Sequence, residues 1–311
     1  MKDSQSRVAV CSRSFSRNPI LRSELQARYE HLSFNDAGLQ LEGDDLVNFL
    51  RGHDKAITAL ERLDEYVLSR LPELKVIGKY GVGLDMIDLE AMREYGKCLG
   101  WTGGVNRRSV SELVIAFAIA MLRHVPAAQR EILSGTWRQL VGGYLSGRTV
   151  GIIGCGHVGK DLVSLLKVFG CPILVYDIRD YREFYELHAI EAVSLEVLLT
   201  RSDIVTLHVP LDESTRNMLD AQRLALLKST AVLINIARGG LVDEGALKEM
   251  LRGNRLAAAA FDVFAVEPPQ DSELLALPNF LATPHIGGSA QEAILAMGRA
   301  AIDGLDHHAI P

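Results

Sequence analysis

The chain has 311 residues, too many for one small hydrophobic core, and this length predicts two domains. Hydrophobic residues make up 48% and charged residues 23%, as in an ordinary globular protein. The net charge of −6 argues against a nucleic acid partner, because phosphates require a basic face. The first residues lack the apolar core of a signal peptide, and no apolar run is long enough to span a membrane. The four cysteines lack the spacing of a zinc site. We therefore predict a cytoplasmic protein with reduced thiols, no membrane partner and no bound metal.

The chain before Gly100 alternates between strand-like and helix-like segments. Asn18 and Pro19 suit the cap and first turn of a helix. The predicted strands are 7–11 and 74–78, residues 56–60 form a short apolar stretch, and the predicted helices are 18–30 and a segment near 64–70. This alternation predicts an α/β domain.

A glycine-containing stretch at residues 100–108 predicts the boundary between the two domains. Ser109 and Glu112 have the spacing of a capping box, so we expect a helix from Ser109 to about His124, with Asn106 as the alternative cap. Apolar residues leave this helix no broad polar face. We therefore expect it to be buried, which a position between domains or between subunits would achieve.

Residues 149–177 contain the most informative motif. A short apolar run at 150–153, which suits a buried parallel strand, leads directly into Gly154, Gly156 and Gly159. In this spacing the first glycine permits a tight turn, and the second lets a pyrophosphate approach the backbone. The third lets a helix pack closely on the strand. The alternative is an ordinary strand-to-helix turn.

The segments after these glycines fall where a dinucleotide-binding βαβ unit requires them. Residues 160–169 have apolar positions near helical spacing, and a second apolar strand at 173–176 leads into Asp177. The carboxylate of Asp177 can accept both hydroxyls of an adenosine ribose and would repel a 2′-phosphate. The sequence therefore predicts a Rossmann unit that prefers NAD to NADP.

The same alternation continues to the end of the chain. Further strands are predicted at 203–208, 231–236, 256–262 and 280–283, and further helices at 221–227, 243–252 and 289–305. Asp243 suits the cap of one of these helices, and Gly253 suits its end. Because the last helix lies beyond the predicted sheet, we expect it to pack back on the N-terminal domain.

Three stretches that end successive strands carry candidate catalytic residues, namely Arg238, Glu267 and His285. The carboxyl ends of parallel strands lie at one edge of a sheet, so we expect these side chains to meet there. Reduction of a 2-keto acid needs an anchor for the carboxylate, a proton donor for the carbonyl oxygen and a hydride donor. Residues of these types can supply the first two.

Arg238 stays charged, and its guanidinium can bind a carboxylate through two hydrogen bonds. His285 can donate and accept a proton near neutral pH, and a neighbouring Glu267 would favour the imidazolium and fix the ring. Each residue also has a structural alternative. Arg238 can be a surface ion-pair partner, Glu267 a turn residue before Pro268, and His285 an ordinary loop histidine.

Further motifs at residues 80–88 (YGVGLDMID), 103–112 (GGVNRRSVSE) and 202–211 (SDIVTLHVPL) accompany the glycine turn and the catalytic stretches. Together they resemble the family of D-isomer-specific 2-hydroxyacid dehydrogenases. The resemblance implies an α/β fold in which a Rossmann-type NAD-binding domain, residues 103–285, is inserted into a smaller flavodoxin-like α/β substrate domain, residues 1–102 and 286–311. It also implies an NAD-dependent enzyme that acts on a small D-2-hydroxy or 2-keto acid.

The resemblance also assigns roles to individual residues. Arg238, Glu267 and His285 match the substrate arginine, the supporting glutamate and the catalytic histidine, and Val82 and Gly83 match the loop whose amides hold the substrate carboxylate. The cofactor contacts that it predicts are Gly154, Gly156, His157, Val158, Gly159, Asp177, His208, Val209, Pro210, Ile236, Ala237, Arg238, Asp262, His285 and Gly288.

Relatives in this family are usually dimers built on the long helix at 109–124, so the resemblance implies a homodimer. We also hypothesise that one or two basic residues recognise a phosphate or second carboxylate on the substrate. The candidates are Arg13, Arg17, Arg62, Lys79, Arg107 and Arg108. Two alternatives to the 2-keto acid reading are a dehydrogenase of another small anion, such as phosphite, and an NAD(H)-sensing, corepressor-like dimer.

Overall fold

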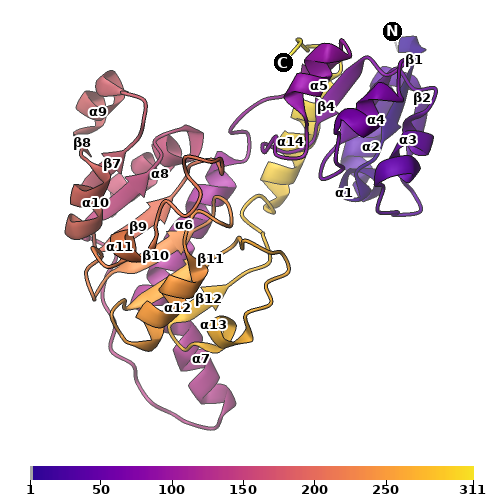
Figure 1. Cartoon of the computed structure of the whole chain (residues 1–311). Coiled ribbons are helices and arrows are strands. Elements are labelled where there is room, and N and C mark those ends of the chain that lie inside the picture. Colours follow the sequence, from indigo (N-terminus) through magenta and orange to yellow (C-terminus); the bar gives the residue numbers. More distant parts are fainter. Residues whose placement is uncertain (1–2) are drawn as a thin grey trace. The chain divides into compact units, whose positions relative to one another are not determined.

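The computed structural model describes residues 3–311 and divides the chain into two compact units, each built on its own parallel sheet (Figure 1). Unit 1 is Met1–Asn106 with Ala290–Pro311, and unit 2 is Arg107–Ser289. Each predicted domain boundary lies four residues before a boundary between the units, at 102 against 106 and at 285 against 289. Unit 2 is therefore inserted between two pieces of unit 1.

Unit 1 has a five-stranded parallel sheet in the order β2-β1-β3-β4-β5, which is the predicted flavodoxin-like order. Its strands are β1 (Asp3–Val10), β2 (Tyr29–Phe34), β3 (Lys55–Thr58), β4 (Val76–Lys79) and β5 (Cys98–Gly100). Its helices are α1 (Arg13–Arg17), α2 (Pro19–Arg28), α3 (Gly43–Leu50), α4 (Glu65–Ser69), α5 (Leu89–Glu94) and α14 (Gln291–Gly304).

Helices cover both faces of the unit 1 sheet. Buried apolar side chains of α3, α4 and α5 form the core on one face, and those of α1, α2 and α14 form the core on the other. A Cβ atom on Gly100 would stand 1.9 Å from the carbonyl oxygen of Gly304, so glycine is needed where α14 crosses β5. The prediction that the last helix packs on the N-terminal domain is confirmed.

Unit 2 has a seven-stranded parallel sheet in the order β12-β11-β10-β9-β6-β7-β8. Counted from β6, its first six strands have the Rossmann order 3-2-1-4-5-6. The strands are β6 (Val150–Ile153), β7 (Ile173–Tyr176), β8 (Glu191–Ala192), β9 (Ile204–Leu207), β10 (Val232–Asn235), β11 (Ala258–Phe261) and β12 (Phe280–Ala282). The helices are α6 (Arg107–Leu122), α7 (Val125–Leu133), α8 (His157–Val168), α9 (Arg182–His188), α10 (Leu195–Arg201), α11 (Ala221–Leu224), α12 (Glu244–Arg252) and α13 (Ser272–Ala276).

The long apolar helix predicted from Ser109 is α6, and it lies with α8 on one face of the unit 2 sheet. Its buried side chains, Val114 and Phe117 among them, face the sheet, so unit 2 itself covers them. The predicted capping box is wrong, because α6 begins at Arg107 and the Ser109 hydroxyl instead donates to the Gly287 carbonyl at 2.6 Å. The Asn106 side-chain oxygen has no hydrogen-bond partner within residues 3–311, so it does not act as the alternative cap.

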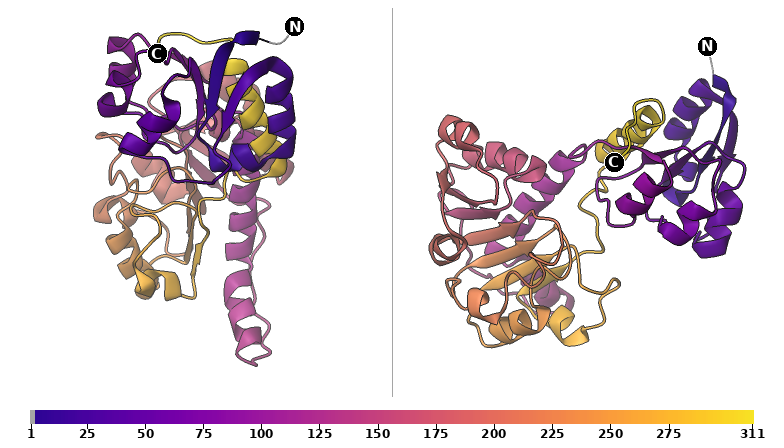
Figure 2. Two further views of the ribbon diagram at one scale, coloured as in Figure 1. Left: turned by 90° about the vertical axis from the view of Figure 1, so that its right-hand side faces the viewer. Right: turned by 45° about the horizontal axis from the view of Figure 1, so that its top comes forward.

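Helix α7 extends beyond the sheet of unit 2 and buries none of its side chains (Figure 2). Arg130 holds it by donating to the carbonyls of Ala276 and Leu277 at 3.0 and 2.9 Å. In the segment that follows, Trp137, Val141 and Tyr144 are at least 80% exposed. Over residues 3–311 no single helix is long and apolar enough to span a membrane, although α6 and α7, bent by 59°, pass that test as a pair.

Most strands and the longer helices were predictable. The strand predicted at 173–176 has those bounds, and Asn18 and Asp243 cap α2 and α12 as expected. Elements that the sequence reading did not predict include β2, α3, α7 and α10. Most of these are short, so they offer little periodicity for a prediction.

Candidate active site

The three glycines after β6 have the geometry that a dinucleotide-binding turn requires. Gly154 has a φ of +98°, and a Cβ there would stand 2.6 Å from the His208 carbonyl oxygen. A Cβ on Gly159 would stand 2.2 Å from the Gly154 carbonyl oxygen, so α8 packs directly on the turn. Gly156 differs from both, because a Cβ there would have no neighbour within 4 Å. The open space lies where a pyrophosphate would approach.

The first turn of α8 can receive that pyrophosphate. The backbone N–H groups at the start of a helix lack partners within the helix, and Gly156 offers no side chain to cap them. His157 and Val158 are the first two residues of α8, as predicted for the residues under the pyrophosphate. This uncapped helix start beside open space fits a bound dinucleotide.

Asp177 follows β7 and holds the glycine turn. Its carboxylate accepts hydrogen bonds from the N–H groups of Cys155 at 2.6 Å and Arg179 at 2.8 Å. The side chain is therefore fixed beside the turn, where it was predicted to bind a ribose. Cys155 itself is fully buried, and burial raises the pKa of its thiol to about 11, which suits a loop-filling residue rather than a reactive thiol.

His208, Val209 and Pro210 follow β9, the strand beside β6. Val209 borders the glycine turn, since a Cβ on Gly154 would stand 2.9 Å from its side chain. The His208 ring lies 3.0 Å from the Thr206 hydroxyl, and burial lowers the pKa of this histidine to about 3. The ring is therefore neutral near pH 7 and gives this side of the site no positive charge.

The Arg238 loop follows β10 and is braced by a buried amide. Asn235 donates to the Arg238 carbonyl at 2.8 Å and accepts from the Ala237 N–H at 3.1 Å. Ile236 is buried below the loop, and Arg238 is partly exposed. The amide of Asn235 thus fixes the backbone from which the predicted substrate arginine projects.

Glu267 and His285 are in direct contact. The Nδ1 atom of His285 lies 2.9 Å from a Glu267 carboxylate oxygen, although 18 residues separate them in the sequence. The second oxygen of Glu267 accepts from the Phe264 N–H at 3.0 Å. Both side chains are partly exposed, at 52% for His285 and 40% for Glu267. The ring is therefore fixed at Nδ1, and Nε2 is the nitrogen left for a reacting group.

Asp262 organises the loop that carries His285. It follows β11, is 1% exposed, and accepts from the Ile286 N–H at 2.8 Å and the Gly287 N–H at 2.7 Å. The Thr283 hydroxyl donates to the same carboxylate. His285 has a φ of +55°, which is uncommon for a residue with a side chain, and these bonds hold the loop around it. Gly288 lies in the turn that follows.

Val82 and Gly83 lie in unit 1, in the loop after the carboxyl end of β4. Both are partly buried, and the Trp101 indole donates to the Val82 carbonyl at 3.1 Å. Their predicted role, donation of backbone N–H groups to a substrate carboxylate, stays a prediction.

Comparison with known proteins identifies the family. The model of the "D-isomer specific 2-hydroxyacid dehydrogenase, NAD binding domain" matches residues 115–287. The hydroxypyruvate reductase of Thermotoga maritima is 35% identical over 278 residues, which cover 88% of this chain and 87% of that protein. The chain belongs to the D-isomer specific 2-hydroxyacid dehydrogenase family.

Two further matches describe how this family member compares with others. The D-3-phosphoglycerate dehydrogenase of Methanocaldococcus jannaschii is 41% identical over 235 residues, which are 75% of this chain but 45% of that protein. The chain thus spans about half the length of the phosphoglycerate dehydrogenases that it matches. The solved structure of the TT0316 protein from Thermus thermophilus has a TM-score of 0.86 and 33% identity, and covers 96% of this chain and 95% of that one.

Family membership establishes the cofactor, because the matched domain is the NAD-binding domain of these dehydrogenases. Unit 2 holds the residues that would contact NAD, and the open space at Gly156 and the fixed carboxylate of Asp177 fit the pyrophosphate and the ribose. The individual contacts stay predictions. Over residues 3–311 no three His, Cys, Asp or Glu side chains gather as a metal site would require.

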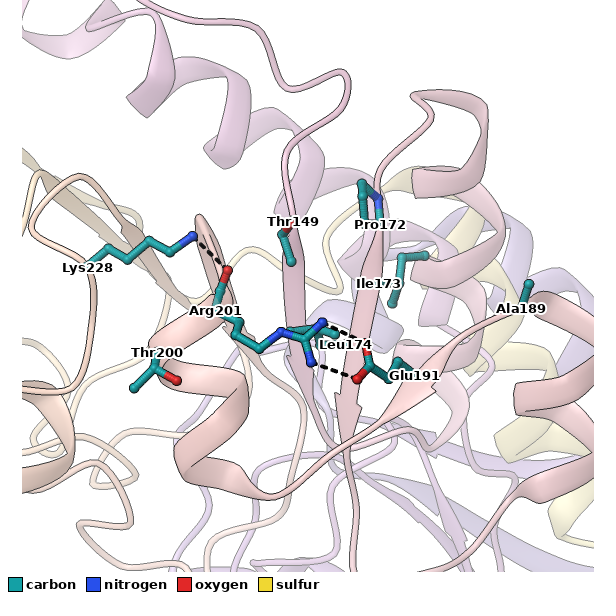
Figure 3. A pocket seen from close by; sticks show the side chains of 9 residues that line it. All are labelled: Thr149, Pro172, Ile173, Leu174, Ala189, Glu191, Thr200, Arg201 and Lys228. Carbon is teal, nitrogen blue, oxygen red and sulfur yellow. Dashed lines mark hydrogen bonds and ion pairs between the residues drawn. The ribbon is translucent and has the colours of Figure 1, made fainter.

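One cavity of about 420 Å³ in this family member lies away from these residues (Figure 3). Thr149 and Ile173, at the amino ends of β6 and β7, line it together with Arg201. Arg201 forms two hydrogen bonds of 2.7 Å with Glu191, and Lys228 donates to the Arg201 carbonyl at 2.7 Å. Ligands of open α/β sheets bind at the carboxyl edge, and the cations here are already paired, so we assign this cavity no substrate.

The sequence did not predict which side chains hold the loops of the candidate site. Asn235 was not singled out, and Asp262 was predicted only as a cofactor contact, yet both hold these loops through side-chain bonds to backbone groups. A polar residue at the end of a buried strand was the available signal. Glu244 was also missed. It contacts the Ala265 N–H across 21 residues, which no local pattern indicates.

Proposed function

We propose that this protein is an NAD-dependent oxidoreductase that interconverts a small 2-keto acid and a D-2-hydroxy acid. The observation that carries the proposal is the 2.9 Å contact between His285 and Glu267 at the carboxyl edge of the sheet in an NAD-binding domain. A histidine fixed by a carboxylate at one nitrogen can transfer a proton at the other. The family and the names of its relatives supply the reaction class.

In this proposal the chain's own residues bind the acid and move a proton. NADH, when bound, supplies the hydride for the keto carbon. His285 donates the proton from Nε2 to the carbonyl oxygen, and in the reverse direction it accepts the hydroxyl proton. Glu267 keeps the ring oriented and stabilises its positive charge. Arg238 holds the substrate carboxylate through a charged pair.

A substrate panel tests this function. Purified protein is mixed with NADH and pyruvate, hydroxypyruvate, glyoxylate or 3-phosphohydroxypyruvate, and loss of the near-ultraviolet absorbance of NADH is followed. We expect turnover with at least one 2-keto acid. No turnover with any of them, together with tight NADH binding, would favour the NAD(H)-sensing alternative. NADH formation from NAD and phosphite would favour the phosphite alternative.

We also propose that the substrate has a second anionic group. Of the basic residues considered, Arg62 pairs with Asp64 at 3.3 Å and Arg108 with Asp161 at 2.9 Å, so neither needs a ligand to be neutralised. Lys79 is 5% exposed and donates to the Ala59 carbonyl, and Arg107 lies 3.9 Å from Asp161. Arg13 and Arg17 are both exposed on α1 and are therefore the strongest candidates. Equal kcat/KM for pyruvate and 3-phosphohydroxypyruvate would contradict this part of the proposal.

The sequence predicted a homodimer built on the helix at 109–124, which is α6, and the buried side chains of α6 pack within unit 2. We propose that the dimer instead uses α7 and the segment after it. Trp137, Val141 and Tyr144 are largely exposed there, and exposed apolar side chains gathered on one segment are typical of an interface. A Trp137→Lys, Val141→Lys double variant should sediment as a monomer, whereas the unmodified chain should sediment as a dimer. A monomeric unmodified chain would contradict the proposal.

A further inference from the structure

The peptide between Phe264 and Ala265 lies where the catalytic loops of unit 2 meet. A Cβ on Gly239, the neighbour of Arg238, would stand 1.9 Å from the Phe264 carbonyl, so the arginine loop packs directly on this peptide. The Phe264 N–H, which belongs to the preceding peptide, donates to Glu267 at 3.0 Å. A shift of Phe264 would therefore move both the arginine loop and the carboxylate that holds His285.

Glu244 fixes this peptide from the other side. It is the first residue of α12, and one of its carboxylate oxygens accepts from the Ala265 N–H at 2.8 Å. The next residues of that loop, Ala265 to Pro268, are exposed, so little apolar packing holds them. The bond from Glu244 is thus an anchor for a segment that core packing does not fix.

Helix capping does not explain Glu244. Asp243 already caps α12 by accepting from the Ala246 N–H at 3.0 Å. Burial raises the pKa of Glu244, and the neighbouring carboxylates of Asp271, Asp243 and Glu267 raise it further, while the Ala265 N–H lowers it. A partly buried carboxylate among other carboxylates does not stabilise the fold by its charge. The hydrogen bond to Ala265 therefore explains why an acid occupies this position.

We propose that Glu244 is a positioning residue: through the Ala265 N–H it holds the loop of residues 263–268 so that Glu267 remains against Nδ1 of His285. This inference rests on the proposed function for its effect on turnover. The hydrogen bond needs a side chain long enough for its acceptor oxygen to reach the Ala265 N–H, and it does not need a negative charge. Substitutions of Glu244 can therefore test the length of the side chain and its charge separately.

Two conservative variants make this separation. Glu244→Gln keeps the length and the acceptor but removes the charge, and Glu244→Asp keeps the charge but shortens the side chain by one methylene. Glu249→Asp is the matched control, because Glu249 lies on the same helix, is exposed, and contacts Arg252 at 3.5 Å. Each variant is compared with the unmodified chain in kcat, KM, the dissociation constant for NADH and the pH profile of keto-acid reduction.

We expect Glu244→Asp to lower kcat by about tenfold, since misplacement of a catalytic group by about 1 Å costs up to about a hundredfold. Its alkaline rate limb should move to lower pH, because a less well held Glu267 stabilises the protonated ring less. The dissociation constant for NADH should change by less than about twofold, because the glycine turn is untouched. Glu244→Gln and Glu249→Asp should behave like the unmodified chain. Full activity of Glu244→Asp, or loss of activity in Glu244→Gln, would overturn the proposal.

A measurement without turnover distinguishes failure of this inference from failure of the proposed function. The pH titration of the His285 ring is followed by nuclear magnetic resonance in the unmodified chain and the three variants. We expect its midpoint to move to lower pH in Glu244→Asp only. An inactive unmodified chain that shows this shift would contradict the proposed function and support the positioning role. Identical titrations in all four proteins would overturn the positioning role.

Discussion

The candidate cofactor turn and the loops of unit 2 that carry the proposed catalytic residues are built in opposite ways. The turn at Gly154, Gly156 and Gly159 depends on missing side chains, because backbone atoms stand where Cβ atoms would be or leave space for a ligand. The loops that carry Arg238 and His285 depend on side chains, since Asn235 and Asp262 hold their backbone groups. Binding of NAD and transfer of the proton should therefore respond to different substitutions.

His285→Ala should show this division most clearly. We expect kcat to fall by about 10²–10⁴-fold, because proton transfer by a positioned group contributes that much. NADH binding should be nearly unchanged, since the glycine turn is intact. Steady-state kinetics and a fluorescence titration with NADH measure the two effects. An unaltered kcat would remove His285 from its proposed role.

Asp177→Ala should give the converse result. Charged hydrogen bonds contribute about 1.5–3 kcal/mol, so we expect about ten- to a hundredfold weaker binding of NAD and a smaller preference over NADP. Loss of the bond to the Cys155 N–H adds to the effect. The kcat at saturating NADH should change little. A preference of the unmodified chain for NADP would contradict the role of this carboxylate.

Gly159→Ala tests the turn through packing alone. The new Cβ would stand 2.2 Å from the Gly154 carbonyl oxygen, and overpacking of this kind costs about 1–3 kcal/mol. We expect a lower melting temperature and weaker NADH binding, by about thirtyfold at the middle of that range. Gly245→Ala is the control, because its Cβ would come no nearer than 3.4 Å to Asp243. Equal behaviour of the two variants would contradict the close packing of α8 on the turn.

Glu244→Gln should have a smaller effect, on stability. The pKa of Glu244 is raised by burial, so the folded chain binds this proton more tightly than the unfolded chain does. The associated stability is present at low pH and is lost as pH rises through the folded pKa. The variant, which cannot ionise, should therefore melt at a higher temperature near neutral pH and lose that advantage below the ordinary value of 4.5. A melting temperature of Glu244→Gln below that of the unmodified chain at every pH would contradict the raised pKa of Glu244.

The contrast between the glycine turn and the loops that carry Arg238 and His285 also shows how far the sequence could predict the site. Glycine spacing is local, and together with the apolar strands beside it this spacing predicted the turn, the acid at Asp177 and a Rossmann unit. Arg238, Glu267 and His285 were predicted because each follows a strand. Glu244 was not, because an acid in the first turn of a helix is ordinary and its partner Ala265 lies on another loop. The capping box was wrong because Ser109 bonds to Gly287, a contact across 178 residues that sequence spacing cannot show.

The central claim is that the protein reduces a 2-keto acid with hydride from NADH, and transfer of deuterium from NADH to the product tests it most directly. NADH deuterated at both C4 hydrogens of the nicotinamide is incubated with the best 2-keto acid of the panel, and the product is examined by mass spectrometry and chiral chromatography. We predict a D-2-hydroxy acid with one deuterium at C2, and almost none from His285→Ala in the same time. An unlabelled product, or the L isomer, would contradict the proposed reaction.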